Sequence, residues 1–316
     1  MSHTPAAADA AIRAGSKSFA AASRLFAPHV RLRVWALYAW CRHCDDVVDG
    51  QAGGHGAIAT DDRTAALATL RADTERALAG DETGPEPFAG LARLARQSGL
   101  PSAFVRAHLD GFAMDVAGRR YETLEDTLDY CYHVAGVVGL MMAWLMGVRD
   151  RATLLRGNDL GLAFQLTNIA RDVADDAAAG RVYLPAVWLR DAGASPEAAT
   201  LMSPANRAGL VRAVRRMLAE ADCYYASAGV GVARLPFRCA WAVATASHVY
   251  RDIGHVVQAK GAAAWESRAH TSRARKAARL VHACGEAMWR RGVVRFLPSP
   301  PRRGLWTPSI PADAPW

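Results

Sequence analysis

Apolar residues along the 316-residue chain recur at spacings of three and four, in long stretches rich in alanine, leucine and arginine. This spacing is typical of amphipathic helices, and the alternating Val, Ile and Thr runs expected of strands are almost absent. Loop signals fall at 50–56, 80–87, 99–101, 180–185, 193–196 and 203–206, and none is long enough to be a domain linker. We therefore predict an all-α protein with a single helical domain over residues 1–297.

The chain changes character at Pro298, where the sequence PSPPRRGLWTPSIPADAPW begins. It holds six prolines in nineteen residues, and proline cannot continue a helix because it lacks a backbone N–H and clashes with the preceding turn. We expect residues 298–316 to form a loose, disordered tail.

A stretch of nineteen residues from Tyr130 to Val148 carries no charged side chain. Its length is at the lower limit for crossing a membrane, and glycines interrupt it. We expect a buried central helix instead. On this helix, the small residues Gly136 and Gly139 would leave room for something apolar to lie alongside.

The composition, 51% hydrophobic and 22% charged residues, is that of a globular protein and excludes general disorder. The net charge of +8 is concentrated between Arg268 and Arg303, where ten basic residues accompany one acid, Glu286. Such a segment attracts the phosphates of a substrate, an anionic membrane or a nucleic acid. A solvated basic helix is the alternative interpretation.

Six cysteines in a chain of this length do not form a disulfide framework, and no signal peptide is recognisable, so we expect a cytoplasmic protein. The sequence WCRHC at 40–44 is similar to a redox C-x-x-C motif. No βαβ pattern surrounds it, and no second pair of zinc ligands accompanies it. We therefore predict a structural role for these cysteines.

The first cluster of candidate catalytic residues lies in a helical stretch at 30–50. At about 100° per residue, one strip of the helix carries Tyr38, Arg42, Asp45 and Asp49. The strip borders an apolar stripe of Val34, Leu37, Cys41 and Val48, whereas Asp46 points farther away. Paired carboxylates on one face suit Mg²⁺, which bridges protein carboxylates to substrate phosphates. A solvated acidic helix end is the alternative.

The second cluster lies at 160–176 and repeats this arrangement. One strip carries Gly161, Gln165, Asn168, Asp172 and Asp176, and it borders an apolar stripe of Leu162, Leu166, Ile169 and Val173. Two such strips in one helical protein predict facing walls of a cavity that holds metal ions and a diphosphate above an apolar pocket.

Four segments together resemble the squalene/phytoene synthase family, and the chain is most similar to its bacterial, phytoene-forming members over roughly residues 12–296. They are GSKSF at 15–19, YAWCRHCDDVVD at 38–49, YCYHVAGVVGLMM at 130–142 and QLTNIARDVADDAAAGRVYLP at 165–185. The resemblance implies an isoprenoid-synthase-type helical bundle around a central cavity. Some members carry a histidine where this chain has Gly15, so one diphosphate contact of the family lacks its counterpart.

The resemblance also implies roles for individual residues. The metal ligands would be Asp45, Asp49, Asn168, Asp172 and Asp176. Catalysis would depend on Asp45, Asp49, Asp172 and Asp176 together with Arg42 and Arg171. Substrate would be bound by Ser16, Lys17, Ser18, Phe19, Tyr38, Gln165, Tyr183, Tyr250 and Arg268.

The implied reaction is a head-to-head condensation of two geranylgeranyl diphosphates to phytoene, through prephytoene diphosphate, in carotenoid biosynthesis. It would need Mg²⁺ or Mn²⁺ and no NADPH. Two related activities remain open, a dehydrosqualene synthase that uses farnesyl diphosphate and a terpene cyclase. A distant alternative is a non-catalytic basic helical protein that binds membranes or nucleic acid, although we do not expect nucleic-acid binding.

The apolar product gives a reason for membrane contact without a spanning helix. We expect the basic segment at 268–303 to contact an anionic membrane electrostatically, at the inner face of the membrane. Salt would then release the protein.

Overall fold

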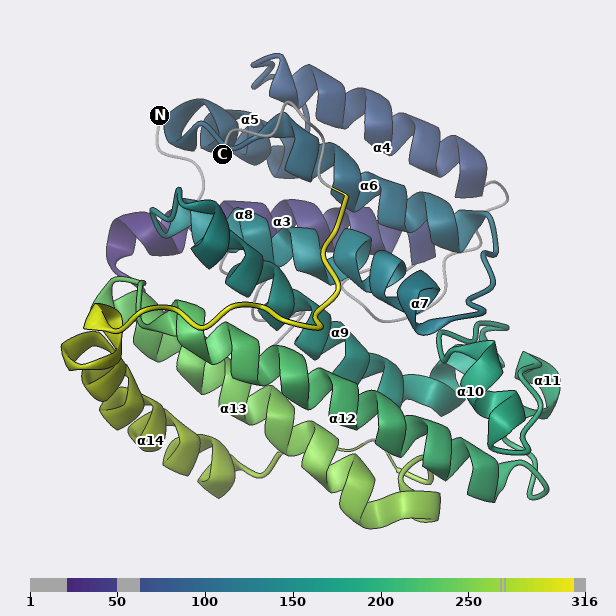
Figure 1. The fold of residues 1–316 in the computed structure, drawn as a ribbon. Coiled ribbons are helices and arrows are strands. Elements are labelled where there is room, and N and C mark those ends of the chain that lie inside the picture. The colour runs from purple at the N-terminus through teal and green to yellow at the C-terminus, as the bar shows by residue number, and fades with distance from the viewer. Residues whose placement is uncertain (1–21, 50–62, 268, 270, 310–316) are drawn as a thin grey trace.

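The computed structural model describes residues 22–49, 63–267, 269 and 271–309, and within these ranges it contains helices and no strand (Figure 1). The larger α-helices are α3 (Pro28–Asp49), α4 (Arg63–Leu78), α5 (Glu86–Ser98), α6 (Ser102–Val116), α7 (Leu124–Cys131), α8 (Val137–Leu145), α9 (Arg151–Ala178), α12 (Arg207–Val232), α13 (Phe237–Lys260) and α14 (Arg273–Gly292). Shorter helices are α10 (Ala186–Asp191), α11 (Ala198–Leu201), the π-helix η1 (Tyr132–Gly136) and the 3₁₀-helices η2 (Gly261–Ala263) and η3 (Val294–Phe296). The all-α prediction is confirmed.

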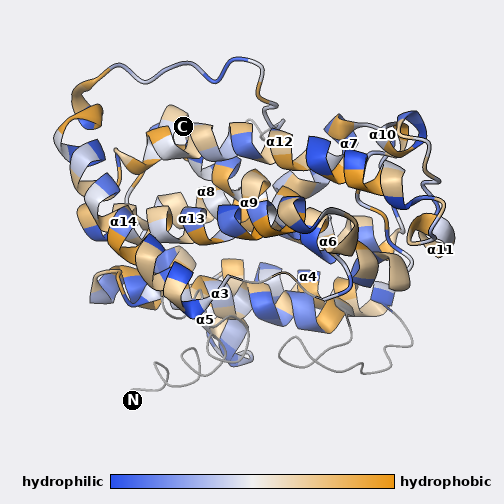
Figure 2. Cartoon of the chain, turned by 90° about the horizontal axis from the view of Figure 1, so that it is seen from below, coloured by the Kyte–Doolittle hydropathy of each residue, from blue (hydrophilic) through white to orange (hydrophobic). Residues whose placement is uncertain are grey.

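Helix α9 forms the centre of the bundle and packs against α8, η1, α12 and α13. Its first turn is capped by Asp150, whose carboxylate accepts a hydrogen bond from the Thr153 backbone N–H at 2.8 Å. The predicted apolar stripe of this helix is fully buried, with Leu162 and Leu166 at 0% exposure. Figure 2 shows hydrophobic and hydrophilic residues sharing each helix, as the spacing of three and four predicts.

The uncharged stretch predicted as a buried helix forms α7, η1 and α8, which run on without a break. By length and composition Leu124–Leu145 could cross a membrane, but 61% of its apolar window is buried inside the protein. Leu140 and Met141 are 0% exposed. The stretch is therefore a central element of the bundle, in agreement with the prediction.

Glycines let α8 and η1 approach α9 closely. A methyl group added to Gly139 would collide with the backbone of Gly157, and one added to Gly161 would collide with the Ala135 carbonyl oxygen. The sequence suggested that the small residues leave room for an apolar molecule. Of the two glycines predicted to do so, Gly139 lines a cavity and Gly136 does not. A methyl group added to Gly136 would collide with the Asn158 side-chain oxygen. The main structural effect of these glycines is to bring helices into close contact.

The proline-rich segment does not behave as a loose tail over its described part. Residues 298–309, here called the C-terminal strap, form no helix and lie across α9 and α12 (Figure 1). Arg302 pairs with Asp159 of α9 and the Trp306 backbone N–H donates to the Tyr224 hydroxyl of α12 at 3.3 Å. Proline prevents a helix here, but side-chain and backbone polar groups still fix the path of the chain.

Gly139→Ala should push α8 away from α9, because the added methyl group would meet the backbone of Gly157. Overpacking of this kind costs about 1–3 kcal/mol, so thermal unfolding followed by circular dichroism should give a melting temperature several degrees lower. The control is Gly285→Ala on α14, where nothing lies within 4 Å of the added carbon. It should leave the melting temperature unchanged or slightly higher. Equal melting temperatures for both variants would contradict the close contact.

Candidate active site

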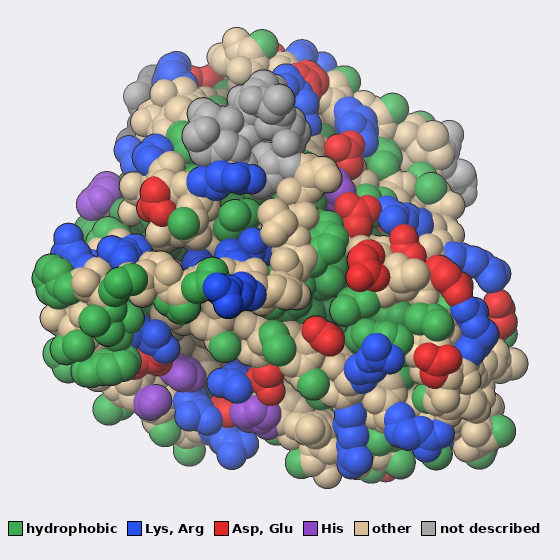
Figure 3. Space-filling model, viewed as in Figure 1, with side chains coloured by type: hydrophobic (Ala, Val, Ile, Leu, Met, Phe, Trp, Pro, Cys, Tyr) green, Lys and Arg blue, Asp and Glu red, His purple; other side chains and the backbone are tan. Residues whose placement is uncertain are grey.

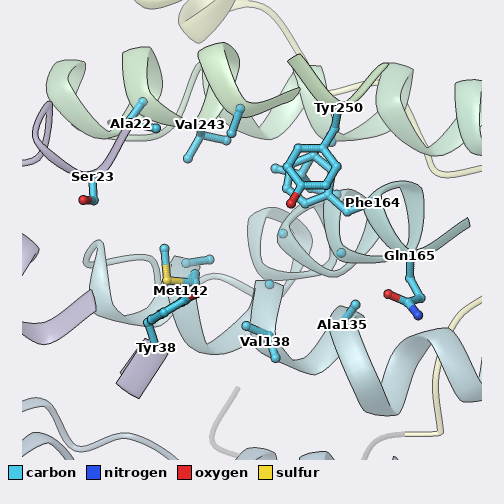
Figure 4. A pocket seen from close by; sticks show the side chains of 18 of the residues that line it. Ala22, Ser23, Tyr38, Ala135, Val138, Met142, Phe164, Gln165, Val243 and Tyr250 are labelled. Atoms are coloured by element: carbon cyan, nitrogen blue, oxygen red, sulfur yellow. The ribbon is translucent and has the colours of Figure 1, made fainter. Parts of the chain in front are cut away.

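A cavity of about 910 Å³ lies between α3, α6, α7, η1, α8, α9, α12, α13 and α14. Its middle is lined by apolar side chains, among them Val138, Met142, Phe164 and Val243 (Figure 4). Polar side chains of α3, α9 and α13 also line it, among them Tyr38, Gln165 and Tyr250 (Figure 4). This combination suits a ligand with a long apolar part and a charged group.

Helix α3 contributes Tyr38, Arg42 and Asp45 to the cavity wall, in agreement with the predicted strip. Arg42 bonds to both following acids, with Nη1 at 2.9 Å from an Asp45 oxygen and Nε at 2.9 Å from Asp46 Oδ1. Asp46 is not part of the cavity wall. Burial raises the pKa of the Tyr38 hydroxyl above its ordinary value. Asp49 ends α3, and its side chain lies outside the described residues.

Helix α9 contributes Gln165 and Asn168 to the opposite part of the wall. The Asn168 amide donates to Gln165 Oε1 at 3.4 Å, while Asn168 Oδ1 is buried with no hydrogen-bond partner among the described atoms. One turn farther along, Arg171 Nε donates to Asp172 Oδ1 at 2.7 Å. Burial and the neighbouring Asp172 carboxylate raise the pKa of Asp176 to about 7. Arg171, which pairs with Asp172, and Arg181, which acts to lower the pKa of Asp176, therefore offset only part of the negative charge at this end of α9.

Tyr250 of α13 connects the two clusters. Its ring stacks on Phe164 with centroids 4.3 Å apart, and it lies across the cavity from Tyr38 in Figure 4. Tyr250 is close enough to influence two other groups. It affects the pKa of Tyr38, which burial raises, and the pKa of Arg171, where burial acts to lower the value and the hydrogen bond to Asp172 raises it. Residues from α3, α9 and α13, far apart in the sequence, therefore share one end of the cavity.

Asp115 of α6 is a cavity residue that sequence reasoning missed. Its carboxylate accepts hydrogen bonds from the Tyr183 hydroxyl at 2.8 Å and the Tyr130 hydroxyl at 3.0 Å. The two tyrosine rings stack at 4.6 Å. Tyr183 was predicted to bind substrate, but it is not part of the cavity wall and instead supports Asp115 from behind.

A signal for Asp115 exists in the sequence. His108, Phe112 and Asp115 follow one another at helical spacing, and all three line the cavity. The surrounding residues match none of the four motif segments, so the spacing alone would have had to identify this helix face.

Two cations of the basic segment also belong to the cavity. Arg273 and Lys276 of α14 line it together with Leu280. The sequence predicted that this segment attracts phosphates of a substrate or a membrane, and it singled out Arg268 but neither of these two residues as substrate-binding. Arg273 is exposed and Lys276 is half-buried, so both lie where the cavity meets the surface of α14. They add positive charge to a site that already contains Arg42.

The cysteines of the WCRHC sequence are buried thiols. Cys41 lines the cavity and Cys44 is 0% exposed, and both are free. Burial raises the pKa of both thiols well above the ordinary value, which keeps them protonated. Cys41 thus packs against the apolar core, as its helical position predicts, and also lines the cavity.

Five predicted site residues lie outside the described part of the chain. They are Ser16, Lys17, Ser18, Phe19 and Arg268.

The oxygen atoms near the end of α9 are of the chemical type that binds a divalent cation. Carboxylates and an amide oxygen are the ligands that Mg²⁺ prefers, and the buried Asn168 Oδ1 is an acceptor without a donor among the described atoms. Among the side chains that the structure describes, no three His, Cys, Asp or Glu residues are grouped to hold one ion. The predicted ligand Asp49 is outside that set.

The chain matches the squalene/phytoene synthase family model over residues 12–275. It is 53% identical to a phytoene synthase from Pseudescherichia vulneris, with 92% of this chain and 94% of the relative covered. It is 50% identical to a 15-cis-phytoene synthase from Pantoea ananas, again covering 92% and 94%. The chain belongs to the squalene/phytoene synthase family.

Solved structures of other proteins are similar to this chain in fold. A dehydrosqualene synthase in complex with a ligand superimposes with a TM-score of 0.78 at 26% identity, covering 89% of this chain and 95% of the other. A squalene synthase from Alicyclobacillus acidocaldarius gives 0.69 at 24% identity, over 80% and 91%. The protein has the all-α isoprenoid-synthase fold. The family consists of divalent-metal-dependent prenyltransferases, and the activity of this chain is that of a phytoene synthase in carotenoid biosynthesis.

Asp115→Asn should lower the rate of diphosphate release about 10- to 100-fold, because an amide offers one oxygen to two tyrosine hydroxyls and removes a charge-assisted interaction worth about 1.5–3 kcal/mol. Initial rates measured on folded protein test this. Asp110→Asn on the same helix is the control, since Asp110 forms an exposed pair with Arg71. Wild-type rates for Asp115→Asn would contradict a role for this carboxylate.

Proposed function

We propose that the substrate is geranylgeranyl diphosphate, two molecules of which are joined in the cavity. The observation that carries this proposal is the shared end of the cavity, where residues of α3, α9 and α13 meet beside a long apolar chamber. The diphosphate would lie among the charged groups, and the prenyl chain would extend between the apolar side chains. The relatives at 50–53% identity named as phytoene synthases support the C20 substrate.

The chain's own residues account for much of the required chemistry. Arg42 and Arg171 would stabilise the negative charge that develops on the leaving diphosphate. The allylic cation left behind would be captured by a double bond of the second substrate. The apolar wall, including Val138, Met142 and Phe164, would keep water away from this cation. A second ionisation, rearrangement and loss of a proton would complete the hydrocarbon without a reductant.

The metal ion is part of the same proposal. Asp45, Asn168, Asp172 and Asp176, together with Asp49, would hold Mg²⁺ or Mn²⁺. When bound, such an ion neutralises diphosphate oxygens and makes diphosphate a better leaving group. The raised pKa of Asp176 and the orphaned Asn168 oxygen support the proposal, because both groups gain from a nearby cation.

Asp172→Ala should reduce hydrocarbon formation at least 100-fold, since it removes a proposed metal ligand and leaves Arg171 without its partner. The assay incubates purified protein with Mg²⁺ and geranylgeranyl or farnesyl diphosphate, without NADPH, and identifies the extracted hydrocarbon by mass. Wild type should give a C40 product from the longer substrate.

The matched control is Asp175→Ala, which removes the same charge from an exposed position on the same helix. It should retain most of the activity. A C30 product alone would move the substrate to farnesyl diphosphate, and equal activity of the Asp172 and Asp175 variants would contradict the proposed site.

We also propose that the protein is cytoplasmic and contacts the membrane peripherally through α14 and η3. The expected electrostatic contact needs revision, because several basic residues of this segment have internal partners. Arg279 pairs with Asp252 and Arg290 with Glu286. Arg291 donates to the Leu235 carbonyl oxygen. Fewer charges therefore remain for lipid headgroups than the sequence suggested.

Apolar side chains on the outer face of the same segment supply a second attraction. Val281 and Phe296 are 74% and 76% exposed, and Met288, Trp289, Val293 and Leu297 are also exposed. Figure 3 shows hydrophobic side chains gathered at the left edge over α14 and η3, with Lys and Arg beside them. Helices with such a face lie in the membrane interface. The inner face of α14 lines the cavity, so an apolar product would leave close to lipid.

Trp289→Ser combined with Phe296→Ser should weaken binding to vesicles of phosphatidylcholine and phosphatidylglycerol in a sedimentation assay. Wild type should remain partly bound at about 1 M salt, where charges more than about 3 Å apart are screened. Leu32→Ser removes an exposed apolar residue from α3 (51% exposed), and this variant should bind like wild type. If salt released wild type completely and the double substitution had no effect, the membrane contact would be purely electrostatic and this proposal would be wrong.

A further inference from the structure

The C-terminal strap supplies a buried ion pair that the bundle needs. Arg302 forks onto Asp159 of α9, with Nε at 2.8 Å from Oδ2 and Nη2 at 2.5 Å from Oδ1. The side chains are 11% and 0% exposed. A fully buried carboxylate is costly unless a cation and hydrogen bonds compensate it. Burial of the Asp159 carboxylate therefore depends on the strap, which covers it and supplies the compensating Arg302.

The same network extends to the cavity wall. The Ser227 hydroxyl donates to Asp159 Oδ2 and accepts from Arg156 Nη1, which lies 2.5 Å away. Arg156 Nη2 donates to the carbonyl oxygen of Pro300 in the strap. Arg156 itself is 7% exposed and lines the cavity. Two strap residues thus hold this guanidinium, one directly and one through Asp159 and Ser227.

Arg156 bounds the cavity far from the charged end. Along α9 it precedes Asn168 by twelve residues, which is about 18 Å at 1.5 Å per residue. Its stem packs against α12, where a methyl group added to Gly231 would lie 2.6 Å from the Arg156 Cβ. The hydrogen bonds turn the guanidinium toward the strap, so the stem forms the wall on the cavity side.

The distance from Asn168 to Arg156 distinguishes between the two candidate substrates by their chain length. An extended prenyl chain advances roughly 4–5 Å per isoprene unit, given carbon–carbon bonds of about 1.5 Å. A chain of four units anchored near Asn168 would reach Arg156, whereas one of three units would end about one unit short. Only the longer chain contacts this part of the wall.

We propose that Arg302 is a positioning residue that fixes Arg156 and thereby the remote wall of the cavity, so that the strap contributes to the preference for a C20 over a C15 chain. This inference rests on the proposed function, because it takes the diphosphate to lie near Asn168. The strap has no contact with the reacting atoms. Its effect is on how well the last isoprene unit is held.

The test measures binding of geranylgeranyl and farnesyl thiolodiphosphates, in which sulfur replaces the bridging oxygen, by calorimetry with Mg²⁺. Arg302→Ala should weaken binding of the C20 analogue about fivefold or more and that of the C15 analogue much less, which lowers the C20-to-C15 affinity ratio. Arg303→Ala removes the same charge from an exposed neighbouring position and should leave the ratio unchanged. Arg302→Lys should restore part of it.

Arg302→Ala leaves Asp159 without its cation and can unfold the protein. The second variant, Arg302→Gln with Asp159→Asn, removes both charges and should show the same fall in the ratio. If both variants keep the C20-to-C15 affinity ratio of wild type, whatever their melting temperatures, the strap has only a structural role and the inference is overturned. Failure of wild type to form a C40 hydrocarbon would contradict the proposed function, while the affinity ratio would still report on the strap.

Discussion

The close approach of α8 and η1 to α9 is the constraint on which the rest of the fold depends. Side chains at Gly139 or Gly161 would separate two backbones that are in contact, and α12 and α13 pack on the other sides of the same helix. Because α9 carries cavity residues along most of its length, its position determines where the polar and apolar parts of the cavity lie. Small residues at a helix crossing thus have a functional consequence far larger than their own contact area.

Negative charge is more fully compensated on α3 than at the acidic end of α9, which begins one turn beyond Asn168 and does not itself line the cavity. Arg42 is bonded to two carboxylates. On α9, burial and the Asp172 carboxylate raise the pKa of Asp176, although Arg171 and Arg181 lie nearby. Carboxylates held together in a partly buried site destabilise the empty protein and favour any cation that enters. The carboxylates thus lower the stability of the unliganded protein at this position, and binding of a cation would restore it.

The periodicity of the sequence correctly predicted which residues share one face of a single helix. The strips with Tyr38, Arg42 and Asp45 on α3 and with Gln165 and Asn168 on α9 face the cavity, because positions four apart share a helix face whatever the tertiary structure is. The family resemblance supplied the partner helix, Tyr250 on α13, which no local pattern indicates.

The features that escaped prediction depend on contacts between distant segments. Asp115 acquires its importance only when Tyr183 folds against it, 68 residues later. Arg273 and Lys276 are indistinguishable in the sequence from basic residues at the surface, because the rotation of α14 about its axis is set by packing on α13. The strap was predicted to be disordered because proline forbids a helix, yet the Arg302–Asp159 pair and the hydrogen bonds at Pro300 and Trp306 fix its path.

The pairing of Asp159 with Arg302 also bears on how the chain folds during synthesis. The partner is 143 residues away, so at about 5–20 residues per second a ribosome needs roughly 7–30 s to deliver it. During this interval the middle of α9 contains a carboxylate that cannot be buried without penalty. The segment of α9 around Asp159 therefore reaches its final packing only after the residues that follow the last helix have been made.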